Sequence, residues 1–400
     1  MSVTRTFIRR VDIHPLRVLY LALDLAPETD DAESIHAREV VKALTEQGHS
    51  VMFAVSGRLS HPPSNPAVKP VGGGSSLGEF IRSWRLVRQF RPEVIYERRF
   101  LPKIAAALRT VSGIPSFVEI NGIVSVEAEM LGVTSVNVLP SRIKKSFHKL
   151  IFRRMTGIVT VTPGLAEQMA RSYGLDPSKI SVVENGANTH LFRPLDKRVC
   201  RERLGLDAQA EWLCFEGGLA PWHGVETAIQ SVRILADRRP SVKLAIVGDG
   251  PCRGALEALV QDLEIKDRVR FFGRVPYEQV PIFIGACDLG VGPFTRRRNQ
   301  QIGSSPIKVY EYIACGRPVV VSRIPGLAEW VSREGLGNVA DPDDPSAFAK
   351  AIEGVLSNPV LLDAMVQKGP AFVKKEHSWD AVASKLAHIL QSALDAATAA

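Results

Sequence analysis

A strand, a helix and a second strand follow one another near the start of the chain. The apolar run Leu16-Arg17-Val18-Leu19-Tyr20-Leu21-Ala22-Leu23 predicts a buried strand, and Val51–Val55 predicts the next one. Between them, Ser34–Gln47 has the apolar spacing of a helix. Gly48 follows it and is suited to the left-handed position at a helix C-terminus. Strands that alternate with helices indicate a parallel sheet covered by helices on both faces.

The same alternation continues along the chain and then begins again. Further strands of the first half are predicted at Val94–Glu97, Pro115–Ile120, Ile158–Val161 and Ile180–Val183, with helices at Leu77–Phe90 and Pro163–Tyr173. The second half has five predicted strands: Trp212–Phe215, Leu244–Val247, Val269–Phe272, Leu289–Val291 and Pro318–Val321. The sequence therefore predicts an α/β protein with two doubly wound domains and a cleft between them, where ligands bind beyond the strand ends.

The predicted domains are residues 1–192, residues 193–376 and a last helix in residues 377–400. Trp379, Val382, Leu386, Ile389 and Leu390 have helical spacing in this last segment. Because the segment follows a complete second domain, we expect it to pack back across the first.

The composition is that of an ordinary globular protein. The chain has 400 residues, of which 45% are hydrophobic and 23% charged, and its formal net charge is +8. The five cysteines are scattered and never spaced as Cys-x-x-Cys, which argues against a disulfide framework and a zinc site. We find no apolar run long enough to span a membrane, no signal peptide and no nucleic-acid-binding motif, so we expect a cytoplasmic protein that does not bind nucleic acid.

The segment Gly303–Pro318 (GSSPIKVYEYIACGRP) carries the strongest chemical signal. Ser305 is a suitable N-cap and Pro306 a suitable first helical residue, so the helix would present free backbone N–H groups to a phosphate. Lys308 and Glu311 share one face of this helix. Glu311 is placed to accept hydrogen bonds from ribose hydroxyls. The alternative is an ordinary surface Lys–Glu pair behind a standard cap.

Basic and glycine-rich loops surround this helix in the sequence. Arg296, Arg297 and Arg298 fall in a predicted loop, Pro293–Ser305, and are suited to neutralising a diphosphate, unless the loop is simply solvated. Gly248–Pro251 and Phe272–Pro276 each follow a strand. Their glycines allow close approach of the backbone to a ligand, although tight strand-to-helix turns need glycine in any case.

Several segments are similar to motifs of one enzyme family, and their order and spacing along the chain are specific to it. They are Tyr96–Arg98, Glu119–Gly122, Thr160–Leu165, Val183–Asn188, Phe192–Pro194, Phe215–Val225, Gly248–Pro251, Phe272–Val275 and Pro306–Pro318. Together they make the chain resemble the retaining glycosyltransferases of family four along nearly its whole length.

The resemblance implies a GT-B fold, with two Rossmann-like domains and a C-terminal helix that returns to the first. It also implies transfer of a sugar from a nucleotide-diphosphate donor to a hydroxyl acceptor, with retention of configuration and without a metal or other cofactor. UDP is the favoured nucleotide, and the acceptor would be a glycan or a lipid-linked precursor in polysaccharide biosynthesis.

The same resemblance assigns expected roles to individual residues. The catalytic candidates are Asn121, Glu119, His36 and Lys308, with the loop from Asp31 to His36 near donor and acceptor. The expected substrate-binding residues are Gly217, Gly218, His223, Gly250, Arg274, Val275, Ser304, Ser305, Ile307 and Glu311. Taken alone, His36 is equally compatible with a histidine on the surface of a helix.

Four positions depart from the family pattern. Gly303 stands where the family usually has a Glu, and Gly218 and His223 stand where it has the Arg and Lys that clamp the diphosphate. The usual double glycine of the first-domain loop is replaced around Asp31-Ala32. We expect Lys308, His223 and one of Arg296–Arg298 to supply the missing charge. An epimerase of the same fold and a non-catalytic sugar-nucleotide-binding protein remain alternatives.

The segment Ser141–Met155 is basic and amphipathic. Arg142, Lys144, Lys145, Lys149, Arg153 and Arg154 alternate with Ile143, Phe147, Leu150 and Ile151. Such a segment is suited to lying on an anionic membrane surface, which would fit a lipid-linked acceptor. The alternative is a helix whose apolar face packs on the core while its basic face is solvated.

Overall fold

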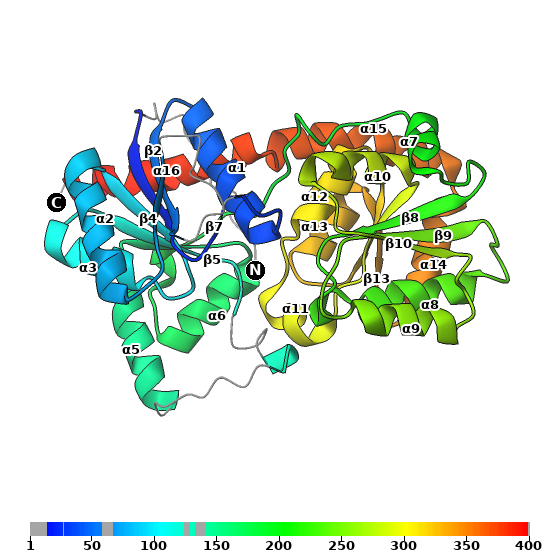
Figure 1. Cartoon of the computed structure of the whole chain (residues 1–400), viewed down its shortest axis with the longest axis horizontal. Helices are drawn as coiled ribbons and strands as arrows, with labels where there is room; N and C mark the ends of the chain where they lie inside the picture. The colour runs from blue at the N-terminus through cyan, green and yellow to red at the C-terminus, as the bar shows by residue number, and fades with distance from the viewer. Residues whose placement is uncertain (1–13, 27, 58–66, 124–128, 133–140, 399–400) are drawn as a thin grey trace.

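The computed structural model describes residues 14–26, 28–57, 67–123, 129–132 and 141–398. These residues form two parallel sheets, each flanked by helices, that lie side by side along the long axis of the molecule (Figure 1). The predicted α/β architecture with two doubly wound halves is confirmed.

The first sheet has the strand order β3-β2-β1-β4-β5-β6-β7. Its strands are β1 (Arg17–Ala22), β2 (Ser50–Ser56), β3 (Val68–Gly72), β4 (Val94–Arg98), β5 (Ser116–Ile120), β6 (Gly157–Thr160) and β7 (Ile180–Val182). In β1, Val18 lies between Val51 of β2 and Val94 of β4, and every residue from Val18 to Ala22 is buried. The sequence did not predict β3. This strand lies at the edge of the sheet and contains Pro70, which breaks the usual pattern of a strand.

Helices cover both faces of the first sheet. They are α1 (Ala32–Glu46), α2 (Ser76–Phe90), α3 (Lys103–Ser112), α5 (Ser141–Arg153) and α6 (Pro163–Tyr173), with the 3₁₀ turn η1 (Pro177–Lys179). Helix α1 begins two residues earlier than predicted. The cause is Asp31, whose carboxylate accepts hydrogen bonds from the backbone N–H groups of Glu33 and Ser34 and so caps the helix.

The second sheet has the strand order β10-β9-β8-β11-β12-β13. Its strands are β8 (Glu211–Glu216), β9 (Val242–Val247), β10 (Val269–Gly273), β11 (Leu289–Gly292), β12 (Val319–Ser322) and β13 (Gly337–Ala340). The edge strand β13 was not predicted, because Gly337 and Asn338 interrupt any apolar run. The helices are α7 (Lys197–Leu204), η2 (Pro221–His223), α8 (Val225–Leu235), α9 (Arg253–Asp262), η3 (Tyr277–Gln279), α10 (Val280–Ala286), α11 (Arg296–Ile302), α12 (Ile307–Ala314), α13 (Leu327–Glu334) and α14 (Pro345–Leu356).

Two long helices return the chain from the second half to the first. Helix α15 (Pro359–Glu376) packs on α12 and α14, and α16 (Trp379–Thr398) packs on α1 (Figure 1). Trp379, Val382 and Leu386 are buried in the same cluster as core residues of β1 and β2. The expected crossing of the C-terminal helix to the first domain is therefore confirmed.

Within the described residues, no helix combines the length and hydrophobicity needed to cross a bilayer.

The strand order places a reversal point in each sheet. In the first sheet the chain winds outward from β1 and β4, and in the second from β8 and β11. Loops diverge on either side of such a point and leave a crevice beyond the carboxyl ends of the strands. Residues that follow β1, β4 and β8 are therefore expected to line a ligand pocket.

Candidate active site

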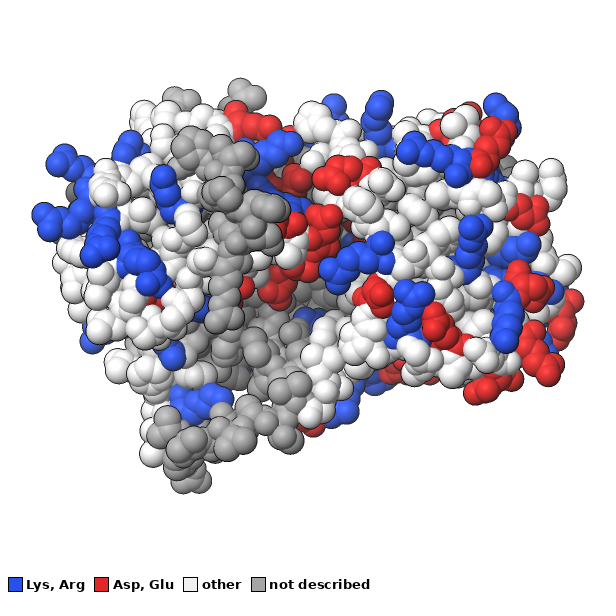
Figure 2. Space-filling view, viewed as in Figure 1, with Lys and Arg blue, Asp and Glu red and all other residues white. Residues whose placement is uncertain are grey.

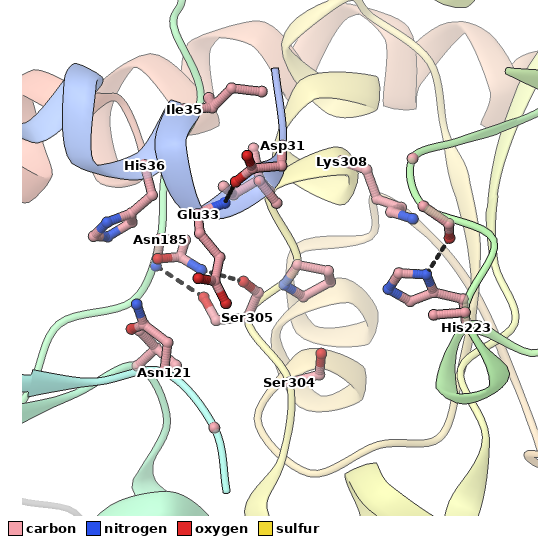
Figure 3. A pocket seen from close by; sticks show the side chains of 18 of the residues that line it. Asp31, Glu33, Ile35, His36, Asn121, Asn185, His223, Ser304, Ser305 and Lys308 are labelled. Atoms are coloured by element: carbon pink, nitrogen blue, oxygen red, sulfur yellow. Dashed lines mark hydrogen bonds between the residues drawn. The ribbon is translucent and has the colours of Figure 1, made fainter. Parts of the chain in front are cut away.

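A pocket of about 520 Å³ lies between the two halves (Figure 3). Residues from both sheets line it, including Asp31, His36 and Asn121 from the first half and His223, Ser304 and Lys308 from the second. The pocket therefore has the location that the reversal points predict.

A buried carboxylate organises the first-half wall of the pocket. Glu119, near the end of β5, is 4% exposed. Its Oε1 accepts a 2.8 Å hydrogen bond from Nδ2 of Asn121 and lies 3.4 Å from Nε2 of His36 and 3.5 Å from Nε of Arg98. Its Oε2 accepts a 2.8 Å bond from the hydroxyl of Tyr96. Glu119 thus orients Asn121, at the predicted strand end, and His36, near the start of a helix as predicted.

His36 is held in its neutral form. Burial is the main cause that lowers its pKa to about 4, and Glu119 only partly opposes this effect. Nε of Arg98 donates to Nδ1 of His36 at 3.3 Å, which leaves the other ring nitrogen to carry the hydrogen toward Glu119. His36 is buried, so the alternative of a histidine on the surface of a helix is wrong.

The two arginines of this wall are already engaged in ion pairs. Arg98 lies near Glu119 and 3.7 Å from Glu33. Arg99 lies 3.2 Å from Glu79 and 3.5 Å from Asp24. Arg98 belongs to the motif Tyr96–Arg98, but the sequence assigns it no role, because its partners lie in other elements.

Ser305 joins the two halves of the molecule. Its hydroxyl accepts a 2.8 Å hydrogen bond from the backbone N–H of Asn185 and lies 3.0 Å from the hydroxyl of Tyr310. The Ser305 carbonyl accepts a 2.6 Å bond from the side-chain amide of Asn185. The prediction that Ser305 caps the helix is wrong, since Pro306 occupies the cap position and α12 has no side-chain cap. The start of α12 nonetheless lines the pocket, with Ser304, Ser305 and Ile307.

Lys308 brings an unpaired ammonium group to the pocket. It is 7% exposed, and its Nζ has no hydrogen-bond partner among the described residues. The ammonium lies 4.2 Å from the centre of the Phe215 ring. A Cβ atom on Gly217 would lie only 2.7 Å from Nζ, so the bare backbone there makes room for the lysine. Burial lowers the pKa of Lys308 to about 8, although Glu216 and Glu311 favour its charged form.

Glu311 and Glu216 form a carboxylate pair behind this ammonium. Glu311 is 1% exposed, and its Oε1 accepts a 2.8 Å hydrogen bond from the hydroxyl of Tyr277. Burial and then the neighbouring Glu216 raise the pKa of Glu311 well above its ordinary value. The alternative of a plain surface Lys–Glu pair is therefore wrong. Glu216 is not predicted as a site residue, because no local pattern in the sequence distinguishes this carboxylate from any other residue at a strand end.

His223 lies close to Lys308, and its surroundings disfavour its charged form. Its Nδ1 is hydrogen-bonded to the carbonyl of Gly218. Burial, followed by the positive charge of Lys308, lowers the pKa of His223 well below its ordinary value. The direction of this pKa shift opposes the expectation that His223 supplies positive charge.

Only one of the three adjacent arginines lines the pocket. Their segment is not a loop as predicted, because Arg296–Ile302 forms the short helix α11. Arg297 points elsewhere and forms a 2.7 Å ion pair with Glu129. Arg298 lines the pocket, and its guanidinium carbon lies 5.7 Å from the centre of the Trp222 ring. Of the three arginines, Arg298 is therefore the one that can supply positive charge to the pocket together with Lys308.

The structure brings the predicted site residues together with one exception. Asn121, Glu119, His36, Lys308, Gly217, Gly218, His223, Arg274, Val275, Ser304, Ser305, Ile307 and Glu311 all line the pocket. Gly250 does not line it. A Cβ atom at Gly250 would lie 2.7 Å from backbone atoms of Leu219, so this glycine permits two loops to pack.

Gly303 has a structural reason to be a glycine. Its φ of 73° belongs to the left-handed region, and a Cβ atom there would lie 2.7 Å from the carbonyl oxygen of Pro325. The backbone at this position therefore excludes the glutamate that the family pattern has. Within the described residues, no cluster of three or more His, Cys, Asp or Glu side chains is arranged to hold a metal ion.

Models of two protein families match this chain. The model of "Glycosyl transferases group 1" matches residues 196–372, and that of "Glycosyltransferase Family 4" matches residues 34–191. D-inositol 3-phosphate glycosyltransferase of Thermobispora bispora is 29% identical over 247 residues, which cover 60% of this chain and 56% of that protein. The enzyme of the same name from Acidothermus cellulolyticus is 32% identical over 59% of this chain and 53% of its own length. The matched part thus spans little more than half of these relatives.

Solved structures share the fold over almost the whole chain. Sucrose-phosphate synthase from Thermosynechococcus elongatus has a TM-score of 0.76 at 20% identity and covers 95% of this chain and 99% of its own. Anabaena Alr3699/HepE in complex with UDP-glucose has a TM-score of 0.74 at 16% identity, over 94% and 100% of the two chains. At this level of identity the likeness establishes the fold alone.

Proposed function

Because this chain belongs to glycosyltransferase family 4, with the group 1 domain in its second half, we propose that it transfers a sugar from a nucleotide-diphosphate donor to a hydroxyl acceptor. We favour a UDP-sugar as the donor and retention of the anomeric configuration. Anabaena Alr3699/HepE was solved with UDP and with UDP-glucose, which supports this choice of nucleotide.

The unpaired ammonium of Lys308 at the start of α12 is the observation that carries the proposal. A nucleotide diphosphate has two negative charges to neutralise, and burying them without cationic partners costs several kcal/mol. Lys308 supplies a buried cation without a hydrogen-bond partner, and Arg298 supplies a second cation on the same pocket. No side chain caps the start of α12, so the backbone N–H groups of Ile307 and Lys308 would add hydrogen bonds.

Glu311 is suited to binding the ribose in this proposal. Its Oε1 already accepts a hydrogen bond from Tyr277, which holds the carboxyl group at a fixed angle. Arg274 and Val275 line the same wall and would contact the base. The nucleotide-sugar donor would thus be held mainly by the second half of the chain.

The transferred sugar would lie against the first half. Asn121 and His36, both oriented by Glu119, face that part of the pocket (Figure 3). His36 is neutral and so adds no positive charge that would compete for the diphosphate, while the side-chain oxygen of Asn121 has no partner among the described residues and can accept a hydrogen bond from the sugar. Catalysis would rest on stabilisation of the departing diphosphate by Lys308, Arg298 and helix N–H groups. In this proposal the protein's own cations, and not a metal ion, balance the leaving group.

A thermal-shift screen of UDP-, GDP-, ADP- and TDP-sugars tests the binding step. A ligand that binds the folded state raises the melting temperature in proportion to the logarithm of its concentration. We expect UDP-sugars to stabilise the wild-type protein and to lose most of this effect in Lys308→Met. The absence of stabilisation by all four classes would contradict the proposal.

Product analysis separates the proposed transferase from its two rivals. A transferase hydrolyses its donor slowly and releases UDP, whereas an epimerase converts the sugar nucleotide without any acceptor. Gly218 and Gly303, which replace charged residues of the family pattern, favour a non-catalytic binding protein as the second candidate. That candidate predicts donor binding with neither UDP release nor transfer to any hydroxyl compound.

A further inference from the structure

Helix α5 has two apolar faces with different surroundings. Ile151 and Phe152 near its end, and Met155 just beyond it, are buried in the core of the first half. Ile143, Phe147 and Leu150 are instead 55%, 50% and 54% exposed. The alternative from the sequence, a helix that hides its apolar residues in the core, therefore holds only for the C-terminal end.

The three exposed side chains form one stripe. Residues spaced by four and then three positions lie on the same face of a helix, so Ile143, Phe147 and Leu150 are neighbours on the surface. A single exposed apolar residue is common on globular proteins, but a contiguous stripe of three large ones indicates a surface that is covered in use.

The helix that carries the stripe and the neighbouring α3 have charges of a single sign. Helices α3 and α5 together contain seven lysines and arginines and no aspartate or glutamate: Lys103, Arg109, Arg142, Lys144, Lys145, Lys149 and Arg153. Figure 2 shows basic side chains gathered at the end of the molecule where Figure 1 places α2 and α3, with few acidic ones among them. The complementary partner is therefore anionic as well as apolar.

The stripe also lies near the pocket. Helix α5 packs on α6, and Leu165 near the start of α6 lines the pocket. A partner that covers the stripe would thus be separated from the pocket by helix α6. An acceptor held at that surface would be close to the cleft.

We propose that this stripe of α5 inserts into the interface of an anionic lipid bilayer. Lipid fits the geometry better than a folded protein does, because the apolar side chains are flanked by long basic ones that can keep their ammonium groups at the headgroups. Lys144, Lys145 and Lys149 are all on this helix and meet anionic headgroups, while Phe147 and Leu150 enter the acyl boundary. The proposed membrane surface does not depend on the proposed transferase activity. Together, the two proposals imply an acceptor that is linked to a lipid.

Vesicle flotation of the full chain tests this surface. Wild-type protein is mixed with vesicles of phosphatidylcholine alone or with added phosphatidylglycerol, and we expect it to float only with the anionic vesicles and to detach as salt is added. Phe147→Ser with Leu150→Ser should lower the partition coefficient by about tenfold or more. Lys144→Gln with Lys149→Gln should do the same for the anionic vesicles.

A matched control distinguishes binding through this stripe from nonspecific binding through any exposed apolar residue. Val360 in α15 is 80% exposed and lies in the second half, so Val360→Ser should float as the wild type does. Circular dichroism and melting temperature verify that each variant is folded. Equal flotation with neutral vesicles, or no loss in the Phe147/Leu150 variant, would overturn the proposal. Self-association of the wild type that this variant abolishes would instead assign the stripe to a second copy of the chain.

Discussion

Asn185 holds Ser305 by two hydrogen bonds across the boundary between the two halves. The backbone N–H of Asn185 donates to the Ser305 hydroxyl at 2.8 Å, and its side-chain amide donates to the Ser305 carbonyl at 2.6 Å. Ser305 immediately precedes the helix cap of α12, which carries Lys308 and Glu311. The loop after β7 thereby fixes the start of this helix relative to the first sheet.

Asn185→Ala should destabilise the protein by about 1–2 kcal/mol, because it leaves the Ser305 carbonyl without its amide partner. Urea unfolding measures this loss. Asn338→Ala is the matched control, since its amide donates a 3.1 Å bond to the Ala351 carbonyl wholly within the second half. Both variants should lose stability, but only Asn185→Ala should also weaken UDP binding. Equal UDP affinities in the two variants would contradict a role for Asn185 in positioning α12.

UDP affinity should fall as the pH rises above about 8. The pKa of Lys308 is lowered to about 8, chiefly by burial, so the ammonium is charged below this pH and progressively neutral above it. A charge-assisted hydrogen bond contributes about 1.5–3 kcal/mol, which corresponds to a loss of about 10- to 100-fold in affinity. Isothermal titration across pH 6.5–9.5 measures the trend.

Lys308→Met should bind UDP weakly at every pH and show a much flatter profile. Lys350→Met is the control for the loss of one positive charge, because Lys350 is exposed and lies outside the pocket. A profile in Lys308→Met that still falls above pH 8 would assign the titration to another group.

Glu311→Ala should weaken UDP binding more than Glu311→Gln does. Burial and the adjacent Glu216 raise the pKa of Glu311 well above its ordinary value, which favours its protonated form, and an amide resembles that form in shape and hydrogen bonding. If Glu311 binds the ribose, discrimination between UDP and 2′-deoxy-UDP should shrink in Glu311→Ala by about tenfold. Binding assays with both nucleotides measure this ratio. An unchanged ratio would place the ribose elsewhere.

Some of these relationships are local in sequence and others are not. Lys308 and Glu311 could be paired from the sequence because helical spacing alone puts them on one face. Asn185 and Glu216 could not be assigned as partners of α12, because each lies about a hundred residues away and only the packing of two domains brings it there. The same distinction holds for the fold. The buried strand β1 is a continuous apolar run, whereas the edge strand β3 has no such pattern.

His36 and His377 should each make the folded protein less stable as the pH falls from 6.5 to 4. Burial is the main cause that lowers the pKa of both side chains to about 4, against an ordinary value of 6.5. At these two histidines the unfolded chain binds protons that the folded protein does not, whereas a buried carboxyl group such as Glu97, whose pKa is raised to about 8, acts in the opposite direction. Urea unfolding at several pH values measures the slope. His36→Gln should change this slope by about one proton, and an unchanged slope in this variant would contradict the prediction.

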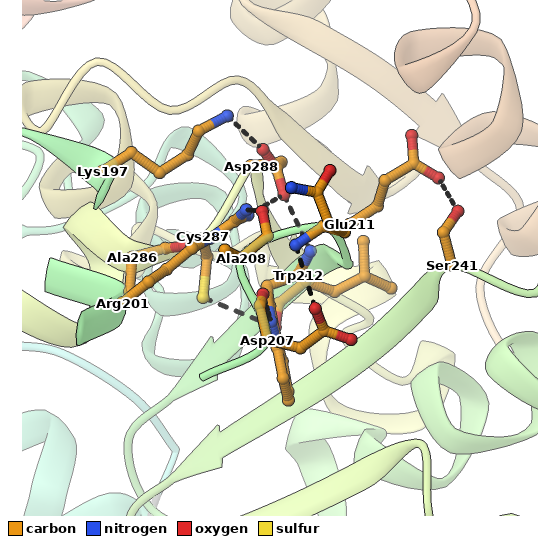
Figure 4. A network of polar contacts seen from close by, with 12 residues as sticks. Lys197, Arg201, Asp207, Ala208, Glu211, Trp212, Ser241, Ala286, Cys287 and Asp288 are labelled. Atoms are coloured by element: carbon orange, nitrogen blue, oxygen red, sulfur yellow. Dashed lines mark hydrogen bonds and ion pairs between the residues drawn. The ribbon is translucent and has the colours of Figure 1, made fainter. Parts of the chain in front are cut away.

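The strongest effect on stability should come from a buried ion pair in the second half (Figure 4). Arg201 of α7 is 5% exposed, and its guanidinium lies 2.6 Å from Oδ2 of Asp288. The guanidinium also donates to the carbonyls of Ala208 and Ala286, and Asp288 accepts a 2.8 Å bond from the backbone N–H of Trp212. This network joins α7 to the starts of β8 and β11.

Arg201→Met should therefore cost about 3–5 kcal/mol, because it leaves the Asp288 carboxylate with its strongest partner removed. Arg198→Met on the same helix is the matched control. Arg198 is exposed and pairs only with Glu202 one turn away, so its loss should cost about 0.5 kcal/mol or less. Both values are measured by urea unfolding, and equal losses would show that the Arg201–Asp288 network adds nothing beyond a surface pair. In Arg201→Met, Lys197 still provides one cation beside the carboxylate, because its Nζ lies 2.7 Å from the other oxygen of Asp288. This remaining ion pair reduces the loss of stability. The double variant Arg201→Met with Lys197→Met should accordingly lose more stability than the sum of the two single variants.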